Sequence, residues 1–212
     1  DLSAVGHWNK DTEVDDYNRR YFEEFVEVVL TALTNKTFSY DGEFWKFPND
    51  NLNPHTHTVY SDYGAGVDGD MTINEIGIAP RPLQAPHPPL YGGFTMSMKT
   101  ALFWAQYGGT PIVLSDNLDF CEALWNTYRE EAARHQIEKP KGQEAAWGGI
   151  AVCAPTDLEA EEQFKDMEWF WDSWARQFGQ GMPLKLVGSP DTISRQIEEA
   201  HDRLGFDEIF YL

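Results

Sequence analysis

The sequence predicts an α/β fold in which helices cover a parallel sheet. Four short apolar runs occur after residue 87, and segments with helical apolar spacing lie between them; the runs are PPLYGG, TPIVLS, WGGIAVCAP and FDEIFYL. This alternation is typical of parallel sheets. The chain has 212 residues, of which 42% are hydrophobic, so it can bury a sizeable core as one large domain or two small ones.

The first predicted element is an amphipathic helix from Asp15 to Leu33. Its apolar residues recur at the i, i+3, i+4, i+7 spacing of a single helix face, formed by Phe22, Phe25, Val26, Val29, Leu30 and Leu33. A hairpin is predicted next, because two aromatic-rich runs flank the turn dipeptide Asp41-Gly42. Residues 48–88 show little periodicity, and a loop of that length is expected to be a lid or a binding loop.

Helices are then predicted over residues 96–107, 118–135 and 156–178, between the apolar runs. The last helix has the clearest end signals: Ser189 as N-cap, Pro190 at its first position and Gly205 after its last turn. Four strands of this kind leave the edges of the sheet uncovered, so the chain is expected to be part of a larger unit.

Composition excludes several classes of function. The chain carries 35 acidic and 16 basic side chains, a net charge of −19, which makes nucleic-acid binding through a basic surface improbable. No apolar run approaches the roughly 18 residues of a membrane helix, and the first residues lack the features of a secretory signal, which favours the cytoplasm. Cys121 and Cys153 are too few for a disulfide framework and are interpreted as reduced core residues.

The junction LYGGFTMSMKTA is the most informative motif. A strand that ends in Gly92-Gly93 and leads into a helix presents backbone N–H groups and a positive helix end, which suits a phosphate, and Thr95 and Ser97 add hydroxyl donors. The alternative is that the glycines make a tight turn and Thr95 caps the helix. VGSPDT is a second candidate anion site, although Ser189 followed by Pro190 is ordinary N-cap chemistry.

Other motifs give weaker signals. His55, His57 and His87 all fall in the long loop, but no second cluster has metal-ligand spacing, so no metal site is predicted. The tryptophans would suit carbohydrate stacking and a glycoside hydrolase. However, Trp169, Trp171 and Trp174 cannot all face one groove, so some of them are expected in the core or at an interface.

The order of the motifs resembles the C-terminal part of luciferase-like flavin-dependent monooxygenases. The resemblance runs through RRYFEEFVEVVLTALTNKTFSYDGEFWKFP, PRPLQAPHPPLYGG, ALFWAQYG, AVCAPTDLEAEEQF and LVGSPDTISRQIEEAHDRLGFDEIFYL, and so covers nearly the whole chain. It implies a TIM-type (β/α)8 barrel of which residues 1–212 supply only strands five to eight, as the C-terminal part of a single domain with an inserted lid-like loop at about 48–88.

The resemblance also implies a function. Gly92, Gly93 and Thr95 match the family's glycine-rich turn after strand five, where backbone and hydroxyl groups approach the flavin phosphate, and Ser97 is their neighbour. A serine is commoner in that turn than the Phe94-Thr95 pair. The implied activity is oxygenation of a small organic substrate by reduced FMN and O₂, with FMN supplied by a flavin reductase and the enzyme forming a homo- or hetero-dimer. The catalytic residues of the family's early strands are not in this sequence.

Three alternatives stay open. The chain could be a non-catalytic flavin-binding or partner subunit of the same family, or a deazaflavin-dependent oxidoreductase. A glycoside hydrolase on a similar barrel would act without flavin.

Overall fold

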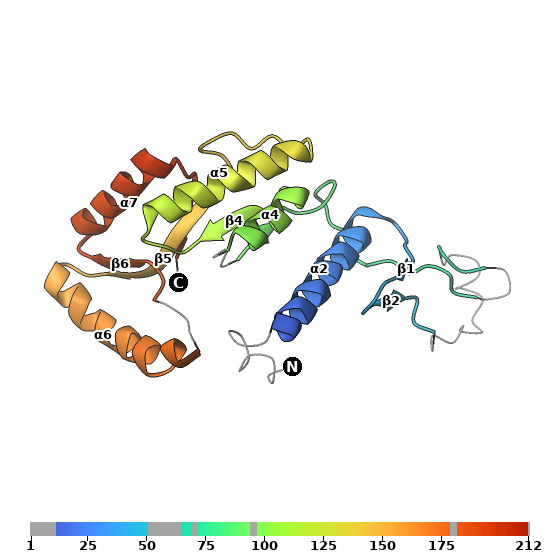
Figure 1. Cartoon of the computed structure of the whole chain (residues 1–212), viewed down its shortest axis with the longest axis horizontal. Coiled ribbons are helices and arrows are strands. Elements are labelled where there is room, and N and C mark those ends of the chain that lie inside the picture. Colours follow the sequence, from blue (N-terminus) through green and yellow to red (C-terminus); the bar gives the residue numbers. More distant parts are fainter. Residues whose placement is uncertain (1–11, 51–64, 69–71, 94–96, 179–181, 212) are drawn as a thin grey trace. The chain divides into compact units, whose positions relative to one another are not determined.

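A computed structural model of the chain describes residues 12–50, 65–68, 72–93, 97–178 and 182–211. They form two compact units, divided between Pro88 and Pro89. Each unit is described by itself (Figure 1). Within the described residues, none of the helices is both long and apolar enough to cross a membrane.

The first unit is built on α2 (Thr12–Thr34), which confirms the predicted helix. Its buried stripe differs from the predicted one, because Phe22 and Phe25 are 41% and 45% exposed while the buried side chains are Val26, Val28 and Ala32. Apolar residues surround most of the C-terminal half of this helix, so helical spacing alone fits more than one stripe.

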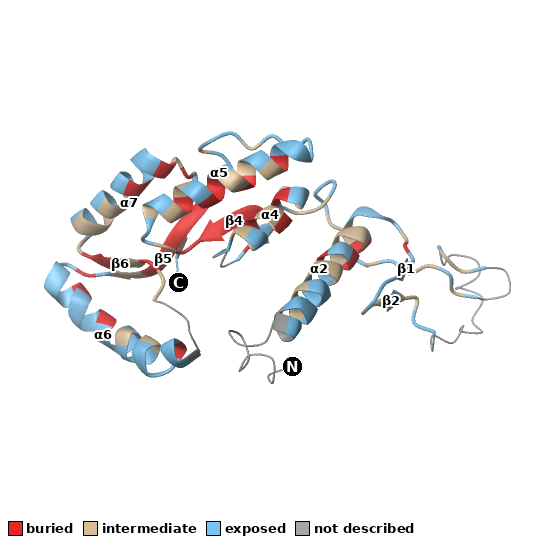
Figure 2. Ribbon diagram, viewed as in Figure 1, coloured by how far each residue is buried: buried red, intermediate tan, exposed pale blue. Residues whose placement is uncertain are grey.

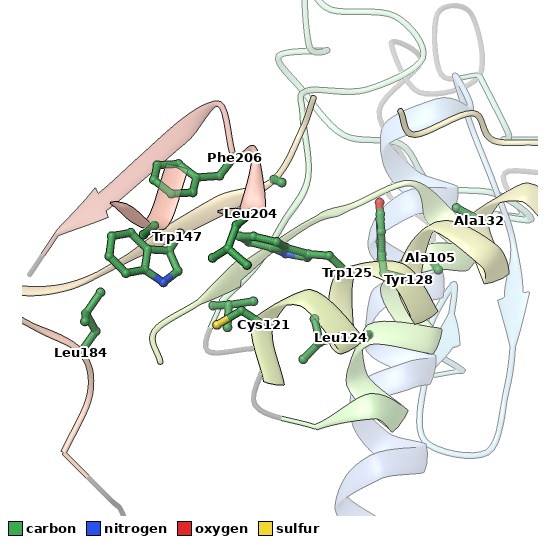
Figure 3. Close-up of a cluster of buried hydrophobic side chains, with 14 of the residues drawn as sticks. Ala105, Cys121, Leu124, Trp125, Tyr128, Ala132, Trp147, Leu184, Leu204 and Phe206 are labelled. Carbon is green, nitrogen blue, oxygen red and sulfur yellow. The ribbon is translucent and has the colours of Figure 1, made fainter. Parts of the chain in front are cut away.

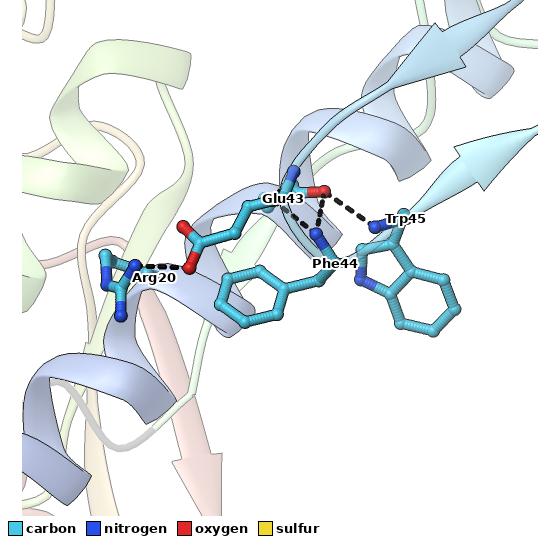
Figure 4. A network of polar contacts seen from close by, with 5 residues as sticks. Arg20, Glu43, Phe44 and Trp45 are labelled. Atoms are coloured by element: carbon cyan, nitrogen blue, oxygen red, sulfur yellow. Dashed lines mark hydrogen bonds and ion pairs between the residues drawn. The ribbon is translucent and has the colours of Figure 1, made fainter.

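The hairpin pairs β1 (Tyr40–Asp41) with β2 (Lys46–Phe47) in antiparallel register. Asp41 lies opposite Lys46, so the predicted turn at Asp41-Gly42 is wrong. The turn lies further along the chain, where the Gly42 N–H donates to the carbonyl of Trp45 at 2.9 Å and leaves Glu43-Phe44 between them. The cause lies outside the hairpin. The Glu24 carboxylate of α2 accepts the backbone N–H groups of three loop residues, at 3.0 Å from Glu43, 3.0 Å from Phe44 and 2.8 Å from Trp45 (Figure 4).

The proline-rich segment is tied to the end of α2. The Arg81 guanidinium donates to the backbone carbonyl of Leu33 at 3.2 Å and also to that of Asn35, so it satisfies carbonyls at the helix C-terminus. Phe38 and Ile76 form an isolated antiparallel bridge nearby. Much of the predicted lid-like loop, residues 51–64 and 69–71, lies outside the described residues.

The second unit contains a five-stranded parallel sheet. Its strands are β3 (Tyr91–Gly92), β4 (Thr110–Val113), β5 (Ala146–Cys153), β6 (Lys185–Gly188) and β7 (Glu208–Tyr211). The order is β3-β4-β5-β6, and β7 also pairs with β5. All four predicted strands are confirmed. β6 was not predicted, because its four residues lie between proline and the N-cap signals of the next helix.

β5 changes its partner halfway along. Residues 146–149 pair with β7, and residues 150–153 pair with β6. At this point Gly148 and Gly149 approach neighbouring backbone so closely that a Cβ would lie 1.6 Å from the carbonyl oxygen of Phe210 and 2.0 Å from that of Leu184. Only glycine allows such an approach.

Helices cover both faces of this sheet (Figure 1). α4 (Met98–Tyr107), α5 (Leu118–Arg134) and α7 (Pro190–Leu204) pack on one face, while α6 (Asp157–Ser173) packs on the other and is followed by a 3₁₀ turn, Ala175–Phe178. The predicted helix over 156–178 is thus two elements. Gly205, at φ 65°, ends α7 as predicted.

The main core lies between the sheet and α4, α5 and α7 (Figures 2 and 3). Trp147 of β5 stacks on Phe206 with ring centroids 5.2 Å apart, and Trp125 and Leu124 of α5 are fully buried beside them. Cys121 lies in this core as predicted, but Cys153 is exposed at the last position of β5, so the core interpretation of Cys153 is wrong.

A smaller cluster of Ile112, Leu114, Ala146 and Phe210 lies on the face of the sheet opposite the main core. Two polar side chains from the outer strands meet in the same unit, where the Tyr91 hydroxyl donates to Glu208 at 3.1 Å. Tyr91 and Glu208 belong to β3 and β7, with β4 and β5 between them in the sheet order. This bond raises the pKa of Tyr91 above its ordinary value.

Candidate functional site: the β3–α4 turn

The candidate site lies where β3 ends and α4 begins. β3 ends at Gly92, Gly93 follows as a turn, and α4 starts at Met98. Ligands of parallel α/β folds bind at the carboxyl ends of the strands, where backbone groups and helix N-termini converge. The turn is therefore at the functional edge of the sheet.

The two glycines of the turn have different surroundings. Gly92 is buried, and a Cβ there would lie 2.4 Å from Cδ1 of Trp104. Gly93 is exposed, and among the described residues no atom lies within 4 Å of a Cβ placed there. Gly93 is thus open on the side of the described residues, whereas Gly92 is a packing position that lets the helix approach the strand.

Ser97 is the N-cap of α4. Its Oγ accepts the N–H of Thr100 at 3.3 Å and lies 2.9 Å from the Thr100 hydroxyl. Helix geometry leaves the N–H groups of Met98 and Lys99 without an intrahelical acceptor, so they point toward the space before the helix. Thr95 lies outside the described residues, and the cap that the sequence alternative gave to Thr95 is made by Ser97.

The charge at this N-terminus differs from that of the helices that follow. The first turn of α4 holds no acidic residue and contains Lys99. The first turns of α5, α6 and α7 each hold a carboxylate, at Asp119, Asp157 and Asp191. Carboxylates stabilise helix N-termini, so in this acidic chain the start of α4 is the one among these four that would gain from an external anion.

The second candidate anion site, before α7, is filled by the chain itself. One Asp157 oxygen accepts the N–H of Ser189 at 2.7 Å, and the other accepts the Thr192 hydroxyl at 3.1 Å. The backbone N–H of Ser189 is the main cause that lowers the pKa of Asp157. Ser189 caps α7 as the N-cap interpretation predicted, and the carboxylate occupies the place that a phosphate would take.

The remaining motifs have structural roles where they are described. The ring of His87 donates from Nδ1 to the carbonyl of Pro88 at 2.7 Å; His55 and His57 lie outside the described residues. No group of three or more His, Cys, Asp or Glu side chains in the described ranges is arranged to hold a metal ion. Trp171 of α6 packs against the buried cluster between this helix and the sheet, as predicted for some of these tryptophans. Trp169 and Trp174 are 72% and 56% exposed.

Sequence reasoning missed two residues that shape these turns. Trp104 packs against Gly92 from α4, and Asp157 reaches the N-terminus of α7 from α6. Neither carries a local signal, because each contact joins residues that are more than ten positions apart. The described part of the β3–α4 turn holds backbone N–H groups, hydroxyls and an ammonium group, the donors that suit an oxyanion, and it supplies no base.

Comparisons with known proteins agree with this fold. The chain matches the family model described as luciferase-like monooxygenase over residues 11–208. No curated protein matches it in sequence.

Three solved structures share the fold at low identity. Monooxygenase RslO1 from Streptomyces bottropensis matches 93% of this chain with a TM-score of 0.63 and 18% identity. The second is the oxygenating constituent of 3,6-diketocamphane monooxygenase from Pseudomonas putida, a type II Baeyer–Villiger enzyme in complex with FMN. It matches 97% of this chain with a TM-score of 0.59 and 15% identity. DmoA from Hyphomicrobium sulfonivorans matches 93% of this chain with a TM-score of 0.58 and 11% identity.

The aligned regions cover 54%, 58% and 51% of those three structures, so the chain spans about half of their length. The family match, in contrast, extends over most of the present chain. Because this match spans residues 11–208, the chain belongs to the luciferase-like monooxygenase family.

Proposed function

We propose that this chain supplies the phosphate-binding side of an FMN-dependent monooxygenase that oxygenates a small organic substrate with O₂. The observation that carries the proposal is the position of Gly93, open among the described residues, next to a helix whose first turn holds no carboxylate. Family membership supports the flavin, and a distant structural relative was solved with FMN.

The described residues fit the phosphate of FMN. Backbone N–H groups at the start of α4 would donate to its oxygens, and the Ser97 and Lys99 side chains lie in the same turn. Glycine at position 93 would let the phosphate come close to the backbone. Reduced FMN, when bound, would supply the electrons for the reaction with O₂, and the protein would bind it, orient it and exclude water.

We further propose that β3, β4, β5 and β7 are strands five to eight of a (β/α)8 barrel. The Tyr91–Glu208 bond and the cluster around Ile112 would then face the barrel interior. The segment at about 48–88 would be the lid over the site, and a separate reductase would deliver reduced FMN to a homo- or hetero-dimer.

The experiment titrates the full chain with FMN and, separately, with riboflavin, which lacks the phosphate. Binding is measured by the change in flavin fluorescence. A series at Gly93 tests the site: Gly93→Ala and Gly93→Leu should weaken FMN binding progressively and leave riboflavin binding and the unfolding midpoint unchanged. Equal affinity of the wild-type chain for the two flavins would remove the basis of the phosphate site. A parallel titration with a deazaflavin coenzyme tests that alternative.

A second candidate is a non-catalytic flavin-binding or partner subunit. It is favoured by the described part of the β3–α4 turn, which offers hydrogen-bond donors to an anion and no base. The mass of the native protein, together with O₂ consumption in the presence of a flavin reductase, separates the two. FMN binding without substrate-dependent O₂ consumption, by a native protein of this size, would favour the subunit.

A further inference from the structure

Trp104 lies in a slot between two glycine positions. A Cβ at Gly92 would lie 2.4 Å from Cδ1 and 2.5 Å from Nε1 of the indole, and a Cβ at Gly109 would lie 2.7 Å from Cε3. The five-membered ring therefore faces Gly92 and the six-membered ring faces Gly109. Any side chain at either position would push the indole away.

The two glycines belong to neighbouring strands. Gly92 ends β3, and Gly109 directly precedes β4, with Gly92 paired to Pro111. The indole therefore fills the layer between α4 and the β3–β4 pair. The size of the indole sets the distance between α4 and the turn.

The same helix carries the proposed phosphate donors. Trp104 is six residues beyond Met98, the first residue of α4, so about 9 Å of rigid helix separates the indole from the N-terminus. A smaller side chain at position 104 would let this helix tilt and would move its N–H groups relative to Gly93. Hydrogen bonds to a phosphate weaken steeply with such misalignment.

Other residues of α4 are more deeply buried than Trp104. Ala101 and Ala105 are fully buried and Phe103 is 6% exposed, whereas Trp104 is only partly buried at the edge of the main cluster. Filling the core therefore does not by itself require an indole at position 104.

We propose that Trp104 is a positioning residue for phosphate recognition at the β3–α4 turn. It acts through Gly92 and through the axis of α4, and has no contact with the ligand. The inference rests on the proposed FMN site, and it adds the residue that fixes the geometry of that site.

The test uses Trp104→Phe and Trp104→Leu in the full chain, with Phe103→Leu as the matched control from the same helix. The readout is the ratio of the riboflavin and FMN dissociation constants, which isolates the phosphate. Trp104→Leu should lower this ratio at least tenfold with riboflavin affinity changed less than twofold. Trp104→Phe, the milder change, should lower it partially, and Phe103→Leu should lower the unfolding midpoint and keep the ratio.

The outcomes separate the inference from the function on which it rests. If the wild-type chain prefers FMN and the Trp104 variants keep that preference, the positioning role is wrong and the FMN site stands. If Phe103→Leu lowers the ratio as much as Trp104→Leu does, the effect is general loss of stability and the positioning role is again wrong. If the wild-type chain shows no preference for FMN, both proposals fail together.

Discussion

The carboxylate of Glu24 should be the main support of the hairpin loop in the first unit. It accepts three backbone N–H groups, from Glu43, Phe44 and Trp45, at 2.8–3.1 Å. A hydrogen bond to a charged group contributes roughly 1.5–3 kcal/mol. These N–H groups are exposed or partly buried and can turn to water, so we expect Glu24→Ala to lower the free energy of unfolding by about 3 kcal/mol in total.

Gly42 provides a second way to break the same contact. A Cβ at Gly42 would lie 2.1 Å from Glu24 Oε1 and 2.6 Å from a ring carbon of Tyr40. Gly42→Ala should therefore displace the carboxylate and destabilise by about 3 kcal/mol, similar to the loss of the bonds themselves. In the Glu24→Ala background the contact with Tyr40 remains, and the same substitution should cost about 1 kcal/mol, a coupling of about 2 kcal/mol.

The assay is urea unfolding of the four proteins of this cycle, together with amide exchange of residues 43–45. Glu23→Ala is the matched control, because Glu23 makes a partly exposed pair with Arg19 at 3.4 Å on the same helix and should change stability by less than about 0.5 kcal/mol. The three loop amides should lose protection in Glu24→Ala and keep it in the control. A coupling below about 0.5 kcal/mol, with unchanged exchange, would refute this account of the loop.

Three further predictions concern the second unit. The pKa of Asp157 is lowered in the folded state, so the stability that this carboxylate contributes is present above its ordinary value of 3.8 and lost as the pH falls through the folded value; the difference in unfolding midpoint between wild type and Asp157→Asn should vanish in strong acid. Burial raises the pKa of Cys121 to about 11, so a thiol reagent at mildly alkaline pH should modify the exposed Cys153 quickly and Cys121 only after unfolding, with Cys153→Ser removing the fast phase. Gly149→Ala would place a methyl group 2.0 Å from the backbone oxygen of Leu184, and unfolding curves should show destabilisation of about 2–3 kcal/mol; a neutral result would mean that β5 does not approach its neighbour so closely.

Local sequence signals predicted most of the elements of the second unit. The four apolar runs became β3, β4, β5 and β7, and the signals at Ser189, Pro190 and Gly205 located α7 to the residue. These features succeed because hydrophobic periodicity and caps act over a few residues. β6 was missed because a four-residue strand between turn residues carries no periodic signal, although it is firmly paired with β5.

Contacts between distant residues were outside the reach of such signals. The dipeptide Asp41-Gly42 favours a turn at those two residues, yet Glu24, on the preceding helix, binds the backbone of residues 43–45 and the turn lies at Glu43-Phe44. Cys153 lies in an apolar run, but it ends up exposed because it is the last residue of β5. The glycine turn was identified correctly as a strand-to-helix junction, and its ligand stays a prediction.

The comparison of α4 with α7 explains why similar sequence signals lead to different expectations. Each helix follows a strand that ends in glycine and begins with a serine cap, so each would offer N–H groups to an anion. At α7 the Asp157 carboxylate, 32 residues earlier in the chain, already accepts the Ser189 N–H, and a phosphate would have to displace it against like-charge repulsion. At α4 the first turn holds a lysine and no carboxylate, so the same backbone geometry is electrostatically open to an anion. The proposed preference for a phosphate at the start of α4 is therefore expected to depend on where the chain's own carboxylates lie, more than on the glycine-serine pattern itself.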